Sequence, residues 1–160
     1  MLIYETSKDG HLISTDRSKL DLALIHDYLS KESYWAKNIP LQTVERSIEN
    51  SFCFGLYKNN LQIGFARAIT DYATFAYLAD VFIIEKYRGS GLSKWLMETI
   101  MNCEALQGLR SWMLATKDAH SLYEKFGFKV IDNPERFMRL GMFQHYPDEG
   151  HRQETADHNK

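Results

Sequence analysis

The sequence predicts an α/β fold, in which a mixed central β-sheet has helices on both faces. Segments with alternating apolar residues and segments with apolar residues at helical spacing follow one another in the order β-β-α-α-β-β-β-α-β-α-β-β. Residues 75–84 are apolar almost without interruption, which is typical of a strand inside a sheet that is covered on both faces. A glycine loop joins this strand directly to a helix. Together these features favour a layered α/β domain.

The composition is that of one globular domain. At 160 residues, with 44% hydrophobic and 25% charged residues, the chain is long enough for one substantial core. We assign residues 1–145 to a single domain and expect residues 146–160, which are polar and without periodicity, to form a mobile tail. The 19 basic and 21 acidic residues nearly balance, which argues against nucleic acids and membrane surfaces as partners. Neither a membrane-spanning run nor a signal-peptide pattern is present, so a cytoplasmic location is expected.

Cysteine and histidine usage points away from a metal centre. Cys53 lies in a strand-like segment, Cys103 follows a helical one, and neither belongs to a CxxC pair. The six histidines are scattered along the chain. We therefore expect two reduced core cysteines and no metal.

The N-terminal third is expected to hold a hairpin and two helices. Residues 1–7 and 11–16 form its strands around a glycine turn. Ser18 followed by Asp21 resembles a capping box that would start the first helix. Pro40 would start the second helix, since proline is tolerated in a first helical turn. The apolar positions are Leu20, Leu24 and Tyr28 in the first helix and Leu41, Val44 and Ile48 in the second.

A second hairpin and a β-α-β unit follow. Residues 52–57 and 61–65 alternate around an Asn-Asn turn, and residues 110–115 form a later strand. The helix after the glycine loop has one apolar face, made of Leu92, Leu96, Ile100 and Cys103.

The C-terminal part is expected to complete the sheet. Asp118 would cap a short helix that ends at Gly127. Residues 128–131 and 136–140 would supply the last strands.

The glycine loop at residues 88–91 has the composition of a phosphate-binding site. Amides at a helix N-terminus lack intrahelical acceptors and lie at the positive end of the helix dipole, so a pyrophosphate can accept hydrogen bonds from them. Gly89 and Gly91 allow close approach of the backbone and a positive φ. By itself this spacing is also compatible with a tight turn that binds nothing. The Walker and dinucleotide-binding patterns do not fit, because the residues that they need after the second glycine are absent.

Two motifs in this sequence resemble those of the GNAT acyltransferases. Residues 86–91 are similar to motif A, Gln/Arg-x-x-Gly-x-Gly/Ala, with Lys86 at the usual Gln/Arg position. Residues 118–128, DAHSLYEKFGF, look like motif B, Ala-x-x-Leu-Tyr-x-Lys-x-Gly-Phe, although Thr116 stands where the family often has an asparagine. The resemblance covers residues 52–140, and it implies the GNAT (acyl-CoA N-acyltransferase) fold and an acetyl-CoA-dependent N-acetyltransferase.

The resemblance also implies roles for individual residues. The amides of the glycine loop, with the Arg88 guanidinium, would hold the pyrophosphate of acetyl-CoA, and strand residues would offer backbone groups to its pantetheine arm. Tyr123 falls on the motif B tyrosine and would protonate the departing thiolate, a step for which the pKa of a phenol is suitable. The expected cofactor-binding residues are Phe82, Ile83, Arg88, Gly89, Ser90, Gly91, Leu92 and Ser93.

Asp80 is the candidate general base. A carboxylate in an apolar strand must face a cavity, a partner or water, because burying it alone is costly. It would remove a proton from the acceptor ammonium through a water. An ion pair with Arg67 that only stabilises the sheet explains Asp80 equally well, and Asp118 and His120 are alternative bases.

The acceptor is the least constrained part of the prediction. Aromatic side chains could form a pocket for an alkylammonium group, or could simply pack in the core. Because neither cysteine lies in a motif, we expect direct transfer to a primary amine, that of a small molecule rather than of a protein. The alternative is a non-catalytic acyl-CoA-binding sensor or interaction module, and a homodimer is possible. The aromatic residues concerned are Tyr34, Trp35, Tyr72, Phe75 and Tyr77.

Overall fold

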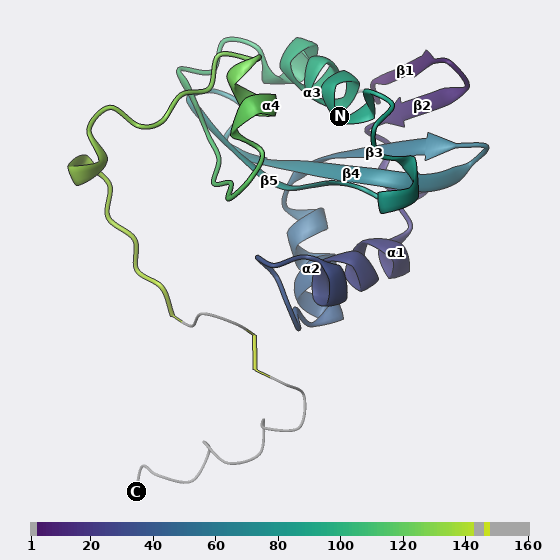
Figure 1. Cartoon of the computed structure of the whole chain (residues 1–160), viewed down its shortest axis with the longest axis horizontal. Coiled ribbons are helices and arrows are strands. Elements are labelled where there is room, and N and C mark those ends of the chain that lie inside the picture. Colours follow the sequence, from purple (N-terminus) through teal and green to yellow (C-terminus); the bar gives the residue numbers. More distant parts are fainter. Residues whose placement is uncertain (1–2, 143–145, 148–160) are drawn as a thin grey trace, which may run out of the picture.

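A six-stranded sheet with helices on both faces forms the body of the protein (Figure 1). The structure is a computed structural model that describes residues 3–142 and 146–147. The strands are β1 (Glu5–Lys8), β2 (His11–Ser14), β3 (Phe52–Lys58), β4 (Leu61–Thr70), β5 (Phe75–Ile83) and β6 (Ser111–Met113), and the α-helices are α1 (Leu22–Asp27), α2 (Leu41–Glu49), α3 (Leu92–Asn102) and α4 (His120–Glu124). The strands lie in sequence order across the sheet, all antiparallel except the parallel pair β5 and β6. The predicted mixed α/β architecture is confirmed.

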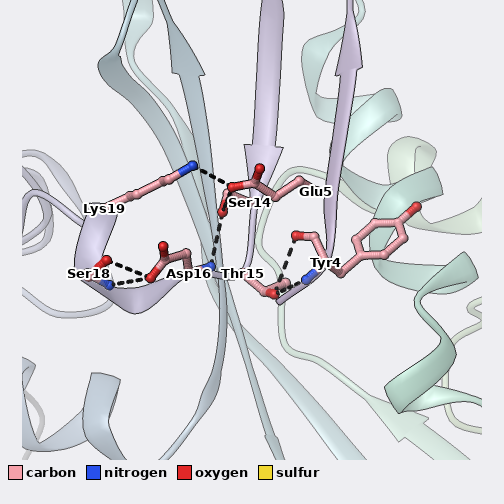
Figure 2. A network of polar contacts seen from close by, with 7 residues as sticks. All are labelled: Tyr4, Glu5, Ser14, Thr15, Asp16, Ser18 and Lys19. Atoms are coloured by element: carbon pink, nitrogen blue, oxygen red, sulfur yellow. Dashed lines mark hydrogen bonds and ion pairs between the residues drawn. The ribbon is translucent and has the colours of Figure 1, made fainter. Parts of the chain in front are cut away.

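The N-terminal hairpin is joined to the segment after it by a network of polar side chains (Figure 2). The Ser14 hydroxyl donates to the Glu5 carboxylate at 2.7 Å, and the same carboxylate pairs with the Lys19 ammonium. The Tyr4 amide donates to the Thr15 hydroxyl at 2.8 Å, which extends the contact between the two chain segments beyond the strands. The hairpin is thereby fixed to the chain that leads into the first helix.

The first helical segment begins differently from the prediction. The Asp16 carboxylate accepts a hydrogen bond from the Ser18 amide and caps a short 3₁₀ turn at Arg17–Lys19. Helix α1 starts later, where the Asp21 carboxylate accepts from the Leu24 amide at 2.9 Å. The predicted capping box at Ser18 is wrong, because each aspartate caps a segment of its own.

Two apolar clusters fill the space between the sheet and its helices. One lies against α3 and contains the whole predicted apolar face of that helix, Leu92, Leu96, Ile100 and Cys103. The other lies against α1 and α2, which cover the opposite face of the sheet (Figure 1). Val44 and Ile48 are buried there as predicted, whereas Leu41, the first residue of α2, is 43% exposed. Cys53 and Cys103 are free and buried.

The end of the chain differs most from the prediction. The segments at 128–131 and 136–140 are not strands, and every residue from 129 to 142 is exposed. The described sheet ends at β6, and residues 128–131 are separated from β6 by a cavity instead of forming a ladder with it. Apart from Tyr146, which packs against the cluster under α1 and α2, and Pro147, the predicted tail at 146–160 lies outside the described residues. No helix within the described part of the chain has the length and apolar character that crossing a bilayer requires.

The start of α4 is also set by a residue other than the predicted one. Ala119 occupies the N-cap position without a side-chain cap, and its amide donates to the Thr116 hydroxyl at 3.0 Å. The expected cap at Asp118 is therefore wrong. Helix α4 itself ends at Glu124, three residues before the predicted end, and Gly127, with φ +85°, closes the turn that follows, because its amide donates to the Glu124 carbonyl at 3.1 Å.

Candidate active site

The loop between β5 and α3 exposes backbone amides at the start of a helix. Gly89 and Gly91 have φ values of +81° and +79°, as the sequence predicted. A Cβ atom added at either position would meet nothing within 4 Å, so the outer side of the loop is open. Gly91 is the N-cap residue of α3 and has no side chain that could cap the helix, and the first amides of α3 lack intrahelical acceptors. The Ser90 hydroxyl is turned back to the Tyr87 carbonyl at 3.1 Å. The loop can thus accept an anion through its main chain.

Strands β5 and β6 separate beside this loop. Their pairing ends at Tyr77 and Met113, whereas β5 continues to Ile83. The later part of β5 therefore has an edge that β6 does not use. The side chains of Phe82 and Ile83 are buried in the two clusters on opposite faces of the sheet, so only their main-chain groups can reach a ligand at this edge.

Arg88 is held at the base of the glycine loop. Its Nε donates to the Ile83 carbonyl at 2.9 Å, and its Nη2 donates to the Tyr28 hydroxyl at 2.9 Å. The Tyr28 ring stacks on Phe82 with centroids 3.8 Å apart. Burial raises the pKa of Tyr28, and the Arg88 charge opposes this shift. Arg88 thus connects the loop to the helical layer on the other side of the sheet, and two of its nitrogens are occupied by protein acceptors.

Asp80 lies at a bulge in β5. It has φ +52°, and the register between β4 and β5 shifts at this point. Its Oδ2 accepts from Arg67 Nε at 2.5 Å, and its Oδ1 accepts from Trp35 Nε1 at 2.9 Å. Arg67 Nη1 donates in turn to the Ser51 hydroxyl at 3.1 Å. Both carboxylate oxygens therefore have donors, and the ion pair that the sequence left as an alternative is present.

Tyr34 and Trp35 form a bridge between β5 and the loop that joins β6 to α4. The Tyr34 hydroxyl accepts from the Lys117 amide at 3.0 Å, on the loop between β6 and α4. The two rings meet edge to face at 5.0 Å, and Trp35 binds Asp80 on β5. Both side chains are close to half exposed, at 48% and 41%. Tyr72, by contrast, packs edge to face on Phe52.

Tyr123 is a buried phenol beside this bridge. Burial raises its pKa to about 12, and the neighbouring Tyr34 and Asp118 add to the shift. Its ring packs edge to face against Phe128 with centroids 6.0 Å apart. It lines an open cavity of about 400 Å³ between residues 112–116 and the segment after α4. The phenol therefore stays protonated at neutral pH, as a proton donor must.

The structure brings most predicted site residues into one region. The glycine loop lies at the end of β5, and Asp80 and Tyr123 lie on either side of the Tyr34–Trp35 bridge. Asp118 and His120 are exposed at the start of α4. Sequence reasoning missed the roles of Tyr28 and Lys117, whose contacts join distant segments and leave no local pattern. No group of three or more metal-binding side chains gathers within residues 3–142 and 146–147.

Comparison with known proteins gives a consistent family assignment. Residues 49–130 match the family model described as an acetyltransferase (GNAT) domain. The chain is 34% identical over 141 residues to "Putative acetyltransferase FG08082" of Gibberella zeae, and this alignment covers 74% of this chain and 78% of that protein. It is 30% identical over 132 residues to "Uncharacterized N-acetyltransferase ycf52" of Gracilaria tenuistipitata var. liui, covering 70% of this chain and 71% of that protein.

Solved structures agree with the sequence matches. A protein of the GNAT family from Xanthomonas campestris pv. campestris superimposes with a TM-score of 0.81 at 48% identity, over 84% of this chain and 95% of that one. A GNAT family acetyltransferase from Elizabethkingia anophelis, determined with acetyl-CoA bound, superimposes with a TM-score of 0.59 at 16% identity, over 78% of this chain and 80% of that one. At that identity the second likeness concerns the fold alone.

Proposed function

Because the chain belongs to the GNAT acetyltransferase family, we propose that it transfers the acetyl group of acetyl-CoA directly to a primary amine of a small molecule. The main support is one juxtaposition: an open glycine loop at the start of α3 lies at the end of β5, where β5 has separated from β6. Such a place offers main-chain donors to a pyrophosphate and a free strand edge to an extended amide-containing arm. The acetyl-CoA bound in the Elizabethkingia anophelis protein is consistent with this ligand.

In this proposal the cofactor lies along the main chain rather than on charged side chains. The amides of residues 89–93 would hold the pyrophosphate, and the edge of β5 near Phe82 and Ile83 would align the pantetheine. Arg88 would contribute mainly by fixing the loop, because its guanidinium already binds Ile83 and Tyr28. Acetyl-CoA would supply the activated acetyl group as a thioester.

Tyr123 is the proposed proton donor for the leaving group. When an amine attacks the thioester carbonyl, the C–N bond forms, the C–S bond breaks, and the sulfur needs a proton. A phenol that burial keeps neutral can donate it. The Tyr34 hydroxyl, which accepts a hydrogen bond from the Lys117 amide, lies near enough to raise the pKa of Tyr123 further. It would help to return a proton from solvent to Tyr123 after each turnover.

Asp80 is the proposed base for the acceptor ammonium. Its carboxylate already accepts from Arg67 and Trp35, so it would act through a water rather than by direct contact. The same contacts support the alternative that Asp80 only positions Trp35. In both cases the half-exposed Trp35 ring would offer a π face to the alkylammonium group of a small amine, whereas the Tyr34 ring already has the Lys117 ammonium 5.7 Å from its centroid.

Calorimetry and a thiol-release assay together test this proposal. Acetyl-CoA should bind the purified protein, and at least one amine of a broad panel should cause release of free CoA thiol. Tyr123→Phe should lower kcat about 10²-fold with little change in acetyl-CoA affinity. Tyr4→Phe, at a tyrosine whose hydroxyl no step of the proposal uses, is the matched control and should leave kcat unchanged.

Two results would contradict the proposal. Absence of acetyl-CoA binding would remove its basis altogether. Binding without thiol release for any amine would instead favour a non-catalytic acyl-CoA sensor.

A further inference from the structure

Arg67 is a largely buried guanidinium inside the sheet, and no step of the proposed reaction uses it. Its strand, β4, lies between β3 and β5, and its main chain pairs with Cys53 on one side and Ala79 on the other. Its side chain is only 16% exposed. A charge in such a place needs partners, and the partners of this guanidinium come from both neighbouring strands or the chain beside them.

The guanidinium holds two groups at once. Its Nε donates to Asp80 Oδ2 at 2.5 Å, and its Nη1 donates to the Ser51 hydroxyl at 3.1 Å. Ser51 is 4% exposed, and its carbonyl accepts from Arg17 Nη2 at 2.8 Å, so this end of the network is fixed as well. A lysine at position 67 could not hold both acceptors in the same way, because it lacks the planar fork of donors that a guanidinium has.

The other end of the network is the Trp35 ring. Asp80 Oδ1 accepts from Trp35 Nε1 at 2.9 Å, while Oδ2 of the same carboxylate is bound to Arg67. The Asp80 side chain is 8% exposed, and its φ of +52° is a conformation that costs free energy and that is typically kept where it serves a function. Trp35, by contrast, is 41% exposed and belongs to neither a helix nor a strand. The hydrogen bond to Asp80 therefore anchors an exposed ring to the buried part of the sheet.

This arrangement does more than an ion pair that only stabilises the sheet. Such a pair needs Arg67 and Asp80 alone. Here the second carboxylate oxygen binds a side chain 45 residues away in the sequence, on the segment before α2. Any change that moves the guanidinium should therefore also change the position of Trp35.

We propose that Arg67, together with Ser51, is a positioning residue that fixes the Trp35 ring through Asp80 and thereby sets how tightly the acceptor amine binds. The link to the amine rests on the proposed function, in which Trp35 offers a π face to an alkylammonium group. Arg67 itself contacts neither the amine nor acetyl-CoA. Its contribution is that a ring held in place before the amine arrives loses less conformational entropy when it binds the amine.

Nuclear magnetic resonance of the isotope-labelled full chain tests the positioning without any substrate. The three tryptophans give three indole N–H signals, and the Trp35 signal is the one that Trp35→Phe lacks. In Arg67→Lys and in Ser51→Ala this signal should shift, and its exchange with solvent should become about 10-fold faster, which corresponds to the loss of one hydrogen bond. The other two signals should not change. Arg110→Lys, the same substitution at an exposed arginine, is the matched control and should leave all three signals as in the wild type.

Steady-state kinetics with an amine from the thiol-release panel tests the consequence for binding. Arg67→Lys and Ser51→Ala should each raise the KM for the amine about 5-fold, the size of a cation–π contact, with a smaller change in kcat and none in acetyl-CoA affinity. In a Trp35→Phe background neither substitution should raise the KM further, since phenylalanine has no N–H for Asp80 to hold. A general structural role would instead weaken both backgrounds alike.

Ser51→Ala decides both measurements if Arg67→Lys does not fold, because it leaves the ion pair with Asp80 in place. An unchanged Trp35 signal in this variant would overturn the proposal. So would increases in KM that persist in the Trp35→Phe background. Absence of turnover with every amine would overturn the proposed function instead, and the indole signals would still decide whether Arg67 positions Trp35.

Discussion

Asp80 combines an unusual backbone with a saturated side chain. Aspartate and asparagine are the non-glycine residues that best tolerate a left-handed conformation, which explains an acidic residue at a bulge with φ +52°. The bulge turns the carboxylate toward Arg67 and Trp35 instead of into the regular pleat. The residue therefore links the sheet to the aromatic bridge, whatever part it takes in proton transfer.

Asp80→Asn separates the two roles of this residue. The amide keeps the backbone preference but removes the charge that pairs with Arg67, so we expect a loss of about 1–3 kcal/mol in the free energy of unfolding. If Asp80 is the base, kcat/KM should fall most near neutral pH and partly recover at alkaline pH, where more of the amine is already deprotonated. Urea unfolding and a pH–rate profile measure the two effects.

Asp27→Asn is the control for this experiment. It removes a carboxylate that pairs with Lys31 on the surface of a helix, where both side chains are more than half exposed, so stability should change little. An Asp80→Asn enzyme with a wild-type pH profile and reduced stability would make Asp80 a structural residue and would direct attention to Asp118 and His120.

Ionisation of the Tyr123 phenol should make the folded protein less stable at high pH. Its pKa is raised to about 12 in the folded state, above the ordinary value of about 10, because burial favours the neutral phenol. This stabilisation is complete below pH 10 and is lost as pH rises from about 10 to about 12. Between pH 8 and pH 11 we expect the free energy of unfolding, measured with urea, to fall by about 1 kcal/mol less in Tyr123→Phe than in the wild type. An identical decline in both proteins would contradict the assigned shift.

At the scale of elements, prediction succeeded where the signal was local. The predicted apolar face of the α3 segment was correct at every position, because the period of its apolar residues is regular and glycines mark the start of the helix. The predicted start of α1 at Ser18 was wrong because Asp21, expected only as the partner of Ser18 in a capping box, is itself the N-cap, and Asp16 caps the turn before it. The last two strands were wrong for a different reason: alternation shows that a segment can be a strand, but a strand also needs a neighbour.

A pair of glycine variants can isolate the role of the loop before α3. Gly91 and Gly108 have nearly the same φ, +79° and +77°, and a Cβ atom would meet nothing within 4 Å at either position. Gly91→Ala and Gly108→Ala should therefore both cost about 1 kcal/mol of stability. Only Gly91→Ala should weaken acetyl-CoA binding, by at least 10-fold, because its methyl group would occupy the space of the pyrophosphate.

Calorimetry of both variants, with urea unfolding alongside, provides the measurement. Equal losses of affinity in the two would mean that strain, and not the loop, is responsible. Unchanged affinity in Gly91→Ala would place the pyrophosphate elsewhere.

Across the whole molecule, contacts between distant segments connect the site to both helical layers. The hydrogen bond from Arg88 to Tyr28 joins residues 60 positions apart, and that from Lys117 to Tyr34 joins residues 83 apart. The glycine loop and the motif tyrosine could be named as site candidates from the sequence because each lies in one short motif. Neither long-range contact has a sequence signal, because a lone tyrosine in a helix or loop looks the same whether or not it bonds to a distant chain segment.

Tyr28→Phe tests whether the layer under the sheet supports cofactor binding. The variant keeps the ring that stacks on Phe82 but removes the oxygen that accepts from Arg88, so the fold should lose no more than about 1 kcal/mol. Without that acceptor the guanidinium is held only by the Ile83 carbonyl, the loop is less ordered, and acetyl-CoA should bind several-fold more weakly. Arg88→Lys alone should weaken acetyl-CoA binding to a similar degree. In the Tyr28→Phe background it should have almost no further effect, since both changes remove the same hydrogen bond between Arg88 and Tyr28. Calorimetric affinities of the two single variants and the double variant complete the cycle, and additive losses would show that Arg88 acts on the cofactor independently of Tyr28.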